Sequence, residues 1–317
     1  MNIIHIDERM KIIDLYDLNQ VERTGAYVIL DEQITVVETS ASPSIPYLKK
    51  GLEALNISLE QVKYIILTHI HLDHGGGAGL FLQDCPNAHI VVHPKAARHI
   101  IDPTKLELGA KEVYKKKFDE LFNPIIPVPK ERVMIKEDNG TLQIGKDTYL
   151  RFHDTPGHAN HHFSIYDPVS NGMFTGDTAG IYYWMLKDQG IDFFLPSTSP
   201  NQFNPEAMKQ SIDFYRKQAL NYLYFGHFGF TSKVNQALDD VEKWIDIFVD
   251  SGRDGYLSSN NDQQRIEKTF MNLQHIVFES LINQGVPKDH SIFSILELDL
   301  KVSAMGLIDF WNKSSDF

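Results

Sequence analysis

The chain has little cysteine, no long apolar run and no excess of positive charge. Cys85 is the only cysteine in 317 residues, which excludes an intramolecular disulfide and predicts a reducing, cytoplasmic location. Nowhere do about eighteen apolar residues follow one another, so no transmembrane helix and no membrane partner are expected. The net charge of −12 offers no basic track to a phosphate backbone, and we expect no nucleic-acid partner.

A cluster of metal-binding residue types follows an apolar, strand-like run, in the segment THIHLDHGGG at residues 68–77. Side chains of a strand alternate between its faces, so His69 and His71 leave the strand end on the same side. The three glycines permit a turn that brings Asp73 and His74 back toward them. Imidazole and carboxylate groups bind zinc, iron and manganese. The segment therefore predicts a metal site, with a surface histidine cluster as the alternative.

Three later turns carry the same chemistry, each at the end of a strand-like segment. The first holds His158 in the sequence DTPGH, the second holds Asp177 in FTGD, and the third holds His227 in FGHFG. Two metal ions that share a water need about six or seven protein ligands, which is more than residues 68–77 offer. These turns supply the ligands that a binuclear site still lacks.

The order of these motifs over residues 24–230 resembles that of the metallo-β-lactamase-fold hydrolases. The phrases TPGHA, FTGDTAG and GHFG are similar to the glyoxalase II branch and its uncharacterised hydrolase relatives. Drug-hydrolysing members commonly have cysteine where Asp177 stands, so we do not expect β-lactam hydrolysis. The resemblance implies two divalent cations, zinc first, with iron or manganese as alternatives. It implies that the first metal is held by His69, His71 and His158, that the second is held by Asp73, His74 and His227, and that Asp177 bridges both.

The same resemblance implies a fold of mixed α/β (α+β) class, the αββα four-layer sandwich of two sheets under outer helices. We expect this hydrolase domain at residues 1–230, with an insertion at 102–132, and an all-helical extension at 231–317. We expect the extension to form a core of its own. A cap over the pocket and a homodimer contact are the alternatives. Strands are predicted at 26–30, 33–38, 62–68, 89–93, 133–136, 148–153, 162–166, 173–175 and 222–225. Helices are predicted at 43–55, 94–101, 109–121, 204–217, 232–250, 261–283 and 287–313.

The resemblance also implies the reaction. A hydroxide held between the two metals would attack a small-molecule ester, thioester or lactone, and no Gly-x-Ser-x-Gly nucleophile segment is present. Asp73 and Asp177 would be the catalytic carboxylates, Asp177 as the bridge and Asp73 as a ligand that also accepts a proton. Phosphodiester hydrolysis, a mononuclear iron oxygenase resembling persulfide dioxygenases, and a non-catalytic metal-binding scaffold are the alternatives. The complete second ligand set disfavours the last two.

Further residues are expected to support the ligands or to meet the substrate. Metal-bound histidines normally donate their other N–H to a carboxylate or carbonyl, and Glu38 resembles the strand-end acid that relatives place beneath the site. An exposed strand-end acid is the alternative. His162 is expected to be a buried supporting residue, and His161 faces either substrate or solvent. Aromatic residues line pockets and cores alike, and a substrate pocket or a core is predicted for Tyr182, Tyr183 and Trp184.

Overall fold

The computed structural model describes residues 2–314, whose strands and helices divide into two compact units. The first unit comprises Met1–Thr155, His161–Gly176 and Leu220–Val234. The second comprises Pro156–Asn160, Asp177–Ala219 and Asn235–Phe317. The chain thus crosses between the units several times, and three of these crossings lie within three residues of His158 or Asp177.

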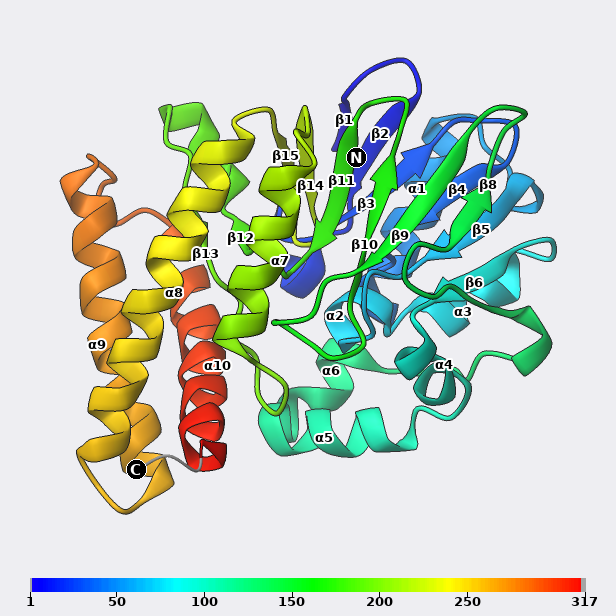
Figure 1. The fold of residues 1–317 in the computed structure, drawn as a ribbon. Coiled ribbons are helices and arrows are strands. Elements are labelled where there is room, and N and C mark those ends of the chain that lie inside the picture. The colour runs from blue at the N-terminus through cyan, green and yellow to red at the C-terminus, as the bar shows by residue number, and fades with distance from the viewer. Residues whose placement is uncertain (1, 315–317) are drawn as a thin grey trace. The chain divides into compact units, whose positions relative to one another are not determined.

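A seven-stranded sheet in the first unit carries its strands in sequence order (Figure 1). The first four strands are antiparallel, and the strands from the fourth onward are parallel. Parallel strands need crossover connections, and helical segments supply them here. The strands are β1 (Ile3–His5), β2 (Met10–Asp14), β3 (Gly25–Ile29), β4 (Ile34–Val37), β5 (Val62–Ile66), β6 (His89–Val92) and β7 (Val133–Ile135).

Helices pack on this sheet through one apolar core. Leu48 and Leu52 of α1 and Phe81 of α3 belong to the same buried cluster as Val36 and Ile65 of the sheet. The remaining helices lie in the connections of the same unit. The helices are α1 (Ile45–Ala54), α2 (Leu72–Gly75), α3 (Ala78–Asp84), α4 (Pro94–Ile101), α5 (Thr104–Tyr114) and α6 (Phe118–Phe122), with short 3-10 turns η1 (Asp17–Asn19), η2 (Ser42–Ser44), η3 (Leu59–Gln61), η4 (Lys115–Lys117) and η5 (Lys130–Arg132).

A second, six-stranded sheet completes the first unit, in the order β15-β14-β11-β10-β9-β8. Strands β11 and β14 pair in parallel, and the other neighbours pair antiparallel. The ring of Tyr27, on β3, lies 5.1 Å from that of Phe174 and 5.6 Å from that of Tyr224, so the two sheets pack face to face. The strands are β8 (Thr141–Gln143), β9 (Tyr149–Asp154), β10 (Phe163–Asp167), β11 (Gly172–Gly176), β14 (Tyr222–Phe225) and β15 (Phe230–Thr231).

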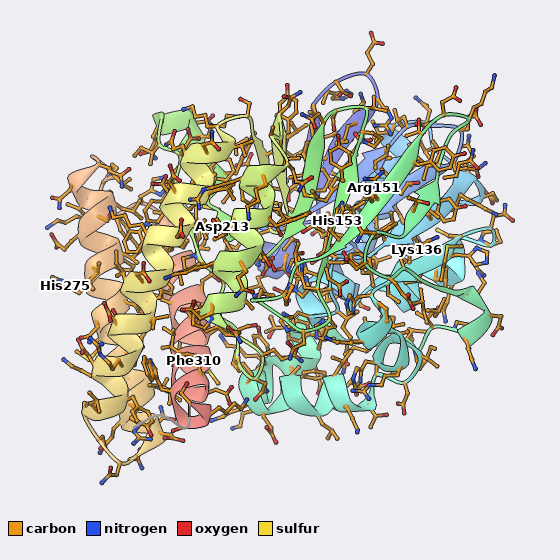
Figure 2. All side chains as sticks on the ribbon, in the orientation of Figure 1. Lys136, Arg151, His153, Asp213, His275 and Phe310 are labelled. Atoms are coloured by element: carbon orange, nitrogen blue, oxygen red, sulfur yellow. The ribbon has the colours of Figure 1, made fainter. Side chains whose placement is uncertain are left out.

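The second unit is mainly helical. Its long helices α8, α9 and α10 lie side by side (Figure 1), and Phe278 of α9 meets Phe293 of α10 at 4.7 Å between ring centroids. Phe310, labelled on α10 in Figure 2, contacts Phe203 at 5.9 Å. The elements are β12 (Ile181–Tyr182), η6 (Trp184–Gln189), β13 (Phe194–Leu195), α7 (Pro205–Lys217), α8 (Val234–Leu257), α9 (Asp262–Asn283) and α10 (Ile292–Lys313).

The predicted mixed α/β class with C-terminal helices is confirmed, and several local predictions are corrected. Strands β1 and β2 occupy a region for which no strand was predicted. The helix predicted at 109–121 is two helices, because Lys115 adopts a positive φ of 49° that ends α5. The last helix begins at Ile292 rather than 287, after the turn that follows Gly285. Within residues 2–314, no helix combines the length and apolarity needed to span a bilayer. The domain boundary at 230/231 stays a prediction.

Candidate metal centre

The turn after β5 brings three of the predicted histidine ligands together. Strand β5 ends at Ile66 and helix α2 begins directly after His71, so residues 67–71 form the turn between them. The ring centroid of His69 lies 4.7 Å from that of His71 and 4.1 Å from that of His74. The backbone N–H of Thr39 donates to the carbonyl of His74 at 3.1 Å, which holds this turn against the end of β4.

Glu38 is buried beneath this turn and accepts two hydrogen bonds. Its Oε2 accepts from Nδ1 of His74 at 2.8 Å, and its Oε1 accepts from the backbone N–H of Thr68 at 2.7 Å. A carboxylate on Nδ1 fixes the histidine tautomer and leaves Nε2 with the lone pair that a metal needs. Glu38 has a positive φ of 70°, a strained conformation for this residue type that the surrounding contacts maintain. The side chain is therefore not the exposed strand-end acid of the alternative interpretation.

Asp73 lies between two histidines of this unit. Its Oδ2 is 3.8 Å from Nε2 of His74 and 3.8 Å from Nε2 of His227. These distances are too long for hydrogen bonds. Donor atoms that sit about 2.0–2.2 Å from one shared ion lie about 3–4 Å apart, so the spacing fits a bound cation. Asp73 is the most exposed of the three, with 27% of its side chain accessible.

His227 stands on the short β14–β15 turn, and a buried tyrosine holds that turn in place. Tyr27 Oη lies 2.9 Å from the carbonyl oxygen of Phe225 and 2.6 Å from that of Gly229, which bracket the histidine. Tyr27 is 1% exposed, and burial raises the pKa of its hydroxyl, so the group stays a neutral donor. The tyrosine thereby fixes the direction from which His227 approaches Asp73.

His158 and Asp177 form the corresponding pair in the second unit. Nε2 of His158 is 3.7 Å from Oδ2 of Asp177, and both side chains are buried. Nδ1 of His158 donates to the carbonyl of Ser197 at 2.9 Å. Before Asp177 the chain turns through Gly176 at a φ of +48°, where a Cβ would lie 2.4 Å from Nε2 of His162. Only glycine fits that position without displacing the histidine.

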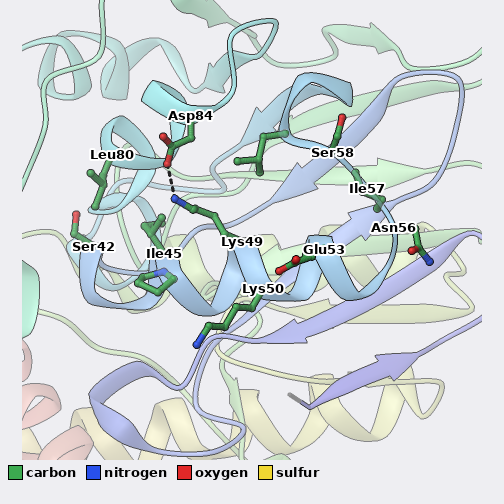
Figure 3. A pocket seen from close by; sticks show the side chains of 12 residues that line it. Ser42, Ile45, Lys49, Lys50, Glu53, Asn56, Ile57, Ser58, Leu80 and Asp84 are labelled. Carbon is green, nitrogen blue, oxygen red and sulfur yellow. Dashed lines mark hydrogen bonds and ion pairs between the residues drawn. The ribbon is translucent and has the colours of Figure 1, made fainter.

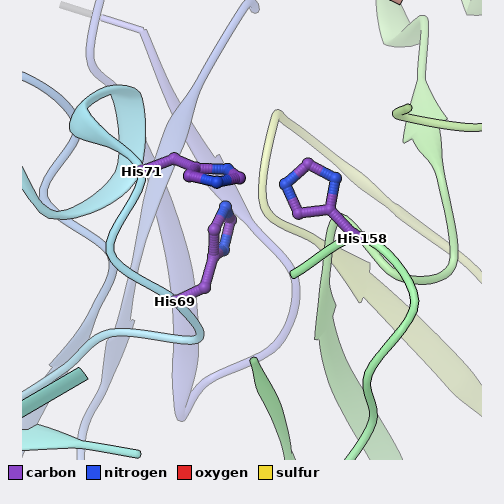
Figure 4. Close-up of side chains that lie close together, drawn as sticks. All are labelled: His69, His71 and His158. Atoms are coloured by element: carbon purple, nitrogen blue, oxygen red, sulfur yellow. The ribbon is translucent and has the colours of Figure 1, made fainter. Parts of the chain in front are cut away.

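Three groups of side chains offer ligand atoms that all lie within 4.8 Å of one another. Imidazole nitrogens and carboxylate oxygens make up every group, which is the donor set of zinc, iron and manganese. The seven predicted ligands all occur in these groups. The groups are His69, His71 and His158 (Figure 4); His69, His74 and Asp177; and Asp73, His74 and His227.

His161 and His162 lie close to this cluster. Nδ1 of His162 lies 3.0 Å from the hydroxyl of Thr155. The ring centroid of His162 lies 5.3 Å from that of His69. The ring of His161 is 5.4 Å from that of His71. His161 is only 4% exposed, so it is not the plain surface histidine of the alternative interpretation.

The aromatic residues predicted for a substrate pocket are packed in the second unit. Tyr182, Tyr183 and Trp184 are 2%, 3% and 8% exposed, and a substrate role for them stays a prediction. Each has a polar neighbour as well as aromatic ones. The neighbours are Asp192, which accepts from Tyr182 Oη; Asp299, which accepts from Tyr183 Oη at 3.2 Å; and Lys187, whose Nζ lies 3.6 Å from the centroid of Trp184.

Some supporting groups were missed by the sequence analysis. Tyr27 and the carbonyl of Ser197 carry no local signal, because their partners are remote in sequence. Asp17, 4% exposed, pairs with Arg23 at 3.2 Å. Burial raises the pKa of Asp17 while Arg23 lowers it, and the charges of Asp73 and His227 also act on it. The only sequence signal for Asp17 was a polar residue next to residue types that are common in turns.

A pocket of about 780 Å³ lies elsewhere in the first unit, along α1 and α3 (Figure 3). Lys49 and Asp84 form an ion pair of 2.8 Å in it. Apolar and charged side chains of both signs line it, and none of them belongs to the three groups above. The lining includes Ile45, Pro46, Lys50, Glu53, Ile57 and Leu80.

Comparisons with known proteins identify the family of the chain. A family model described as "Metallo-beta-lactamase superfamily" matches residues 22–227. The chain is 28% identical over 244 residues to the "Metallo-beta-lactamase fold-containing protein ST1585" of Sulfurisphaera tokodaii, which covers 73% of this chain and 84% of the relative.

Solved structures share the fold. The structure of ST1585, from an organism there named Sulfolobus tokodaii, aligns with a TM-score of 0.66 at 20% identity and covers 95% of this chain and 98% of its own. The metallo-beta-lactamase family protein TTHA1429 from Thermus thermophilus aligns with a TM-score of 0.65 at 16% sequence identity. The alignment covers 98% of this chain and 95% of that protein. A structure described as a peroxy diiron species of the chemotaxis sensor ODP aligns with a TM-score of 0.53 at 15% sequence identity. The alignment covers 76% of this chain and 93% of that protein.

Proposed function

Since a family model covers residues 22–227, the chain belongs to the metallo-β-lactamase superfamily, and we propose from this premise that it is a binuclear metal-dependent hydrolase. The observation that carries the proposal is the convergence of seven histidine and aspartate side chains in three groups of ligand distance. We propose the glyoxalase II-like part of the superfamily on the motifs TPGHA, FTGDTAG and GHFG.

The proposed ligand assignment follows the groups. His69, His71 and His158 would hold the first ion, and Asp73, His74 and His227 the second. Asp177 would bridge, because its carboxylate has two oxygens and it belongs to a group with histidines of both sets. Zinc is the first choice, with iron or manganese as alternatives that accept the same donors. When bound, the two ions supply a water of lowered pKa and polarise the electrophilic oxygen of the substrate.

The protein's own groups have separate tasks in this proposal. Glu38 and the Ser197 carbonyl each hold a histidine Nδ1–H and so keep the opposite nitrogen available as a ligand. Asp73 is the acidic group that reaches solvent, with 27% of its side chain exposed against 3% for Asp177. Asp73 is therefore the proposed proton acceptor as well as a ligand.

We propose a small-molecule ester, thioester or lactone as the substrate class. The net charge of −12 opposes binding of an extended phosphate backbone. Cys85 is fully buried, and burial raises the pKa of its thiol to about 12, which leaves it protonated and unsuited as a nucleophile. Hydrolysis would then proceed without a covalent acyl-enzyme. The cytoplasmic location and a homodimer through the C-terminal helices stay predictions.

The decisive experiment measures metal content and activity together. Metal-free protein would be reloaded with Zn²⁺, Fe²⁺ or Mn²⁺, analysed for ions per chain, and assayed on esters, thioesters, lactones and phosphodiesters. We expect two ions per chain and activity on one of the first three classes. Saturation at one iron, with oxygen consumed, would instead support the mononuclear oxygenase.

Matched variants make the assignment specific. His227→Ala should empty chiefly the second site, and Asp177→Ala should disturb both, because it is the proposed bridge. His275→Ala is the control, since this histidine is exposed on α9. Single-turnover hydrolysis in ¹⁸O-labelled water should place the label in the product alone. A label in a protein carboxylate would contradict direct attack by water.

A further inference from the structure

We propose that the C-terminal helix α10 sets the position of His158 through the segment at residues 197–204. The inference rests on the proposed function, because His158 is a ligand in the proposed metal site. All the residues involved belong to the second unit. The C-terminal helices would then be part of the support of the metal site rather than an independent appendage.

The first contact in this series is the hydrogen bond made by His158 itself. A carbonyl oxygen can only accept, so the 2.9 Å bond to Ser197 places the proton on Nδ1 of the imidazole. Nε2 then carries the lone pair, and it faces Oδ2 of Asp177 at 3.7 Å. The Ser197 carbonyl therefore fixes both the tautomer and the ring direction of the ligand. Its own position depends on the segment that carries it.

The segment at residues 197–204 is tied to the turn that bears His158. Asn204 donates from its backbone N–H to the carbonyl of Gly157 at 2.8 Å, and the backbone N–H of Asn160 donates to Oε1 of Gln202 at 2.7 Å. Gly157 has a φ of +135°, and a Cβ there would lie 2.4 Å from the Cα of Met208 on α7. The turn and the segment are thus joined by one backbone–backbone hydrogen bond and one bond from a backbone N–H to a side chain. Both satisfy backbone groups that helix or sheet pairing leaves without a partner.

Helix α10 also contacts the segment at residues 197–204. Thr198 donates from Oγ1 to the carbonyl of Ser303 at 3.1 Å. A Cβ at Gly306 would lie 1.9 Å from the Thr198 carbonyl oxygen and 2.7 Å from the carbonyl carbon of Ser199. Asp309 accepts from the backbone N–H of Asn201 at 3.1 Å. Positions 303, 306 and 309 recur every three residues, so one face of α10 makes all these contacts.

Gly306 is the most sensitive point of this arrangement. The atoms that an added methyl group would meet are backbone atoms of the segment, which cannot rotate away as a side chain could. The segment must move, and the Thr198 carbonyl is only one residue from the Ser197 carbonyl that holds His158. A shift of a few tenths of an ångström there changes the hydrogen bond on Nδ1. Disturbing such a partner of a metal ligand typically costs about 10–100-fold in metal affinity.

The test uses the full chain and Zn²⁺ with a competing chelator as the probe. The variants are Gly306→Ala and Thr198→Val, and Thr198→Ser should retain wild-type binding because it keeps the hydroxyl. His158→Ala identifies which titration step contains this ligand. We expect Gly306→Ala to weaken that step about 10–100-fold and Thr198→Val to weaken it in the same direction. The step that contains His227 should change less. Gly109→Ala is the control, because nothing lies within 4 Å of a Cβ on that helical glycine.

A second readout needs no metal. ¹⁵N-histidine NMR of the metal-free protein should show the Nδ1–H tautomer for His158, with its signal shifted in Gly306→Ala and unshifted in Gly109→Ala. Unchanged signals and titration steps in folded variants would overturn the inference while leaving the hydrolase proposal standing. Wild-type protein that binds no Zn²⁺ would refute the proposed function, and the NMR comparison would still decide the inference. If Gly306→Ala does not fold, Thr198→Val decides, and unchanged binding there overturns it.

Discussion

Replacing Glu38 by glutamine tests whether a buried carboxylate determines the strength of the proposed second metal site. The two oxygens of Glu38 accept from two donors, Nδ1 of His74 and the backbone N–H of Thr68. Glutamine has one carbonyl oxygen and one NH₂ group, so one of these donors must face an N–H. The alternative is that His74 changes tautomer and accepts on Nδ1. Nε2 would then carry the proton and could not bind a metal.

The size of the effect follows from the burial. Glu38 is 2% exposed and His74 is 1% exposed, so water cannot replace the lost acceptor. A buried donor left unsatisfied costs about 1–3 kcal/mol. Since about 1.4 kcal/mol corresponds to a tenfold change in an equilibrium constant, we expect Zn²⁺ affinity at the second site to fall about 10–100-fold. Glutamine keeps the length and backbone preference of the residue, so the positive φ adds no new strain.

The assay is chelator competition with Zn²⁺, with elemental analysis to count the ions. The variant should weaken the titration step that His227→Ala abolishes and spare the other. Glu32→Gln is the control, because Glu32 is an exposed glutamate in the same unit. A folded Glu38→Gln protein that binds both ions as tightly as wild type would refute the reasoning. It would show that the hydrogen bond on Nδ1 does not control the ligand nitrogen of His74.

Three more predictions follow from other buried groups. Tyr27→Phe removes the hydroxyl that holds the turn of His227, so the free energy of unfolding in urea should fall by about 1–3 kcal/mol, and a loss below about 0.3 kcal/mol would contradict the role of this bond. Burial lowers the pKa of His93, although Asp154 raises it. The folded protein favours the neutral imidazole, so its contribution to stability is complete above about pH 6.5. This contribution is lost as the pH falls through the lowered folded-state pKa of His93. His93→Asn should therefore flatten the acid side of the stability curve of metal-free protein by up to about 1.36 kcal/mol per pH unit, and an unchanged slope would argue against it. Cys85→Ser should lower stability but leave turnover close to wild type, as measured by initial rates, because the buried thiol has a pKa of about 12.

The sequence predicted the elements whose signal is local. The apolar run of β5 followed by His69 and His71 indicates a strand end that carries two imidazoles. The glycines after His74 do not make the predicted turn, because Gly76 and Gly77 adopt helical φ values of −61° and −83°. The long helices α8 and α9 were expected from their apolar spacing. Superfamily membership was predicted from motif order, and the family model confirms it.

The local signal failed where a segment depends on distant partners. Strand β1 is the edge of the first sheet, and β2 is buried between β1 and β3 with α1 packed against it. Their residues carry no turn or motif that marks them. The helix predicted at 109–121 breaks at Lys115, whose positive φ is not encoded by a glycine. Propensity alone cannot reveal such a break, because a strained backbone is maintained by its surroundings.

The amino-acid sequence by itself determined which chemical groups this protein can offer to a metal, because ligand type and spacing along a strand end are local properties. Tertiary structure alone decided how those groups are oriented. Glu38 meets His74, Tyr27 brackets His227, and the Ser197 carbonyl meets His158. Each of these contacts joins residues remote in sequence, and each fixes the tautomer or direction of a ligand. Such a partner is chosen by the packing of sheets and helices, which bring the two residues together only after the chain has folded.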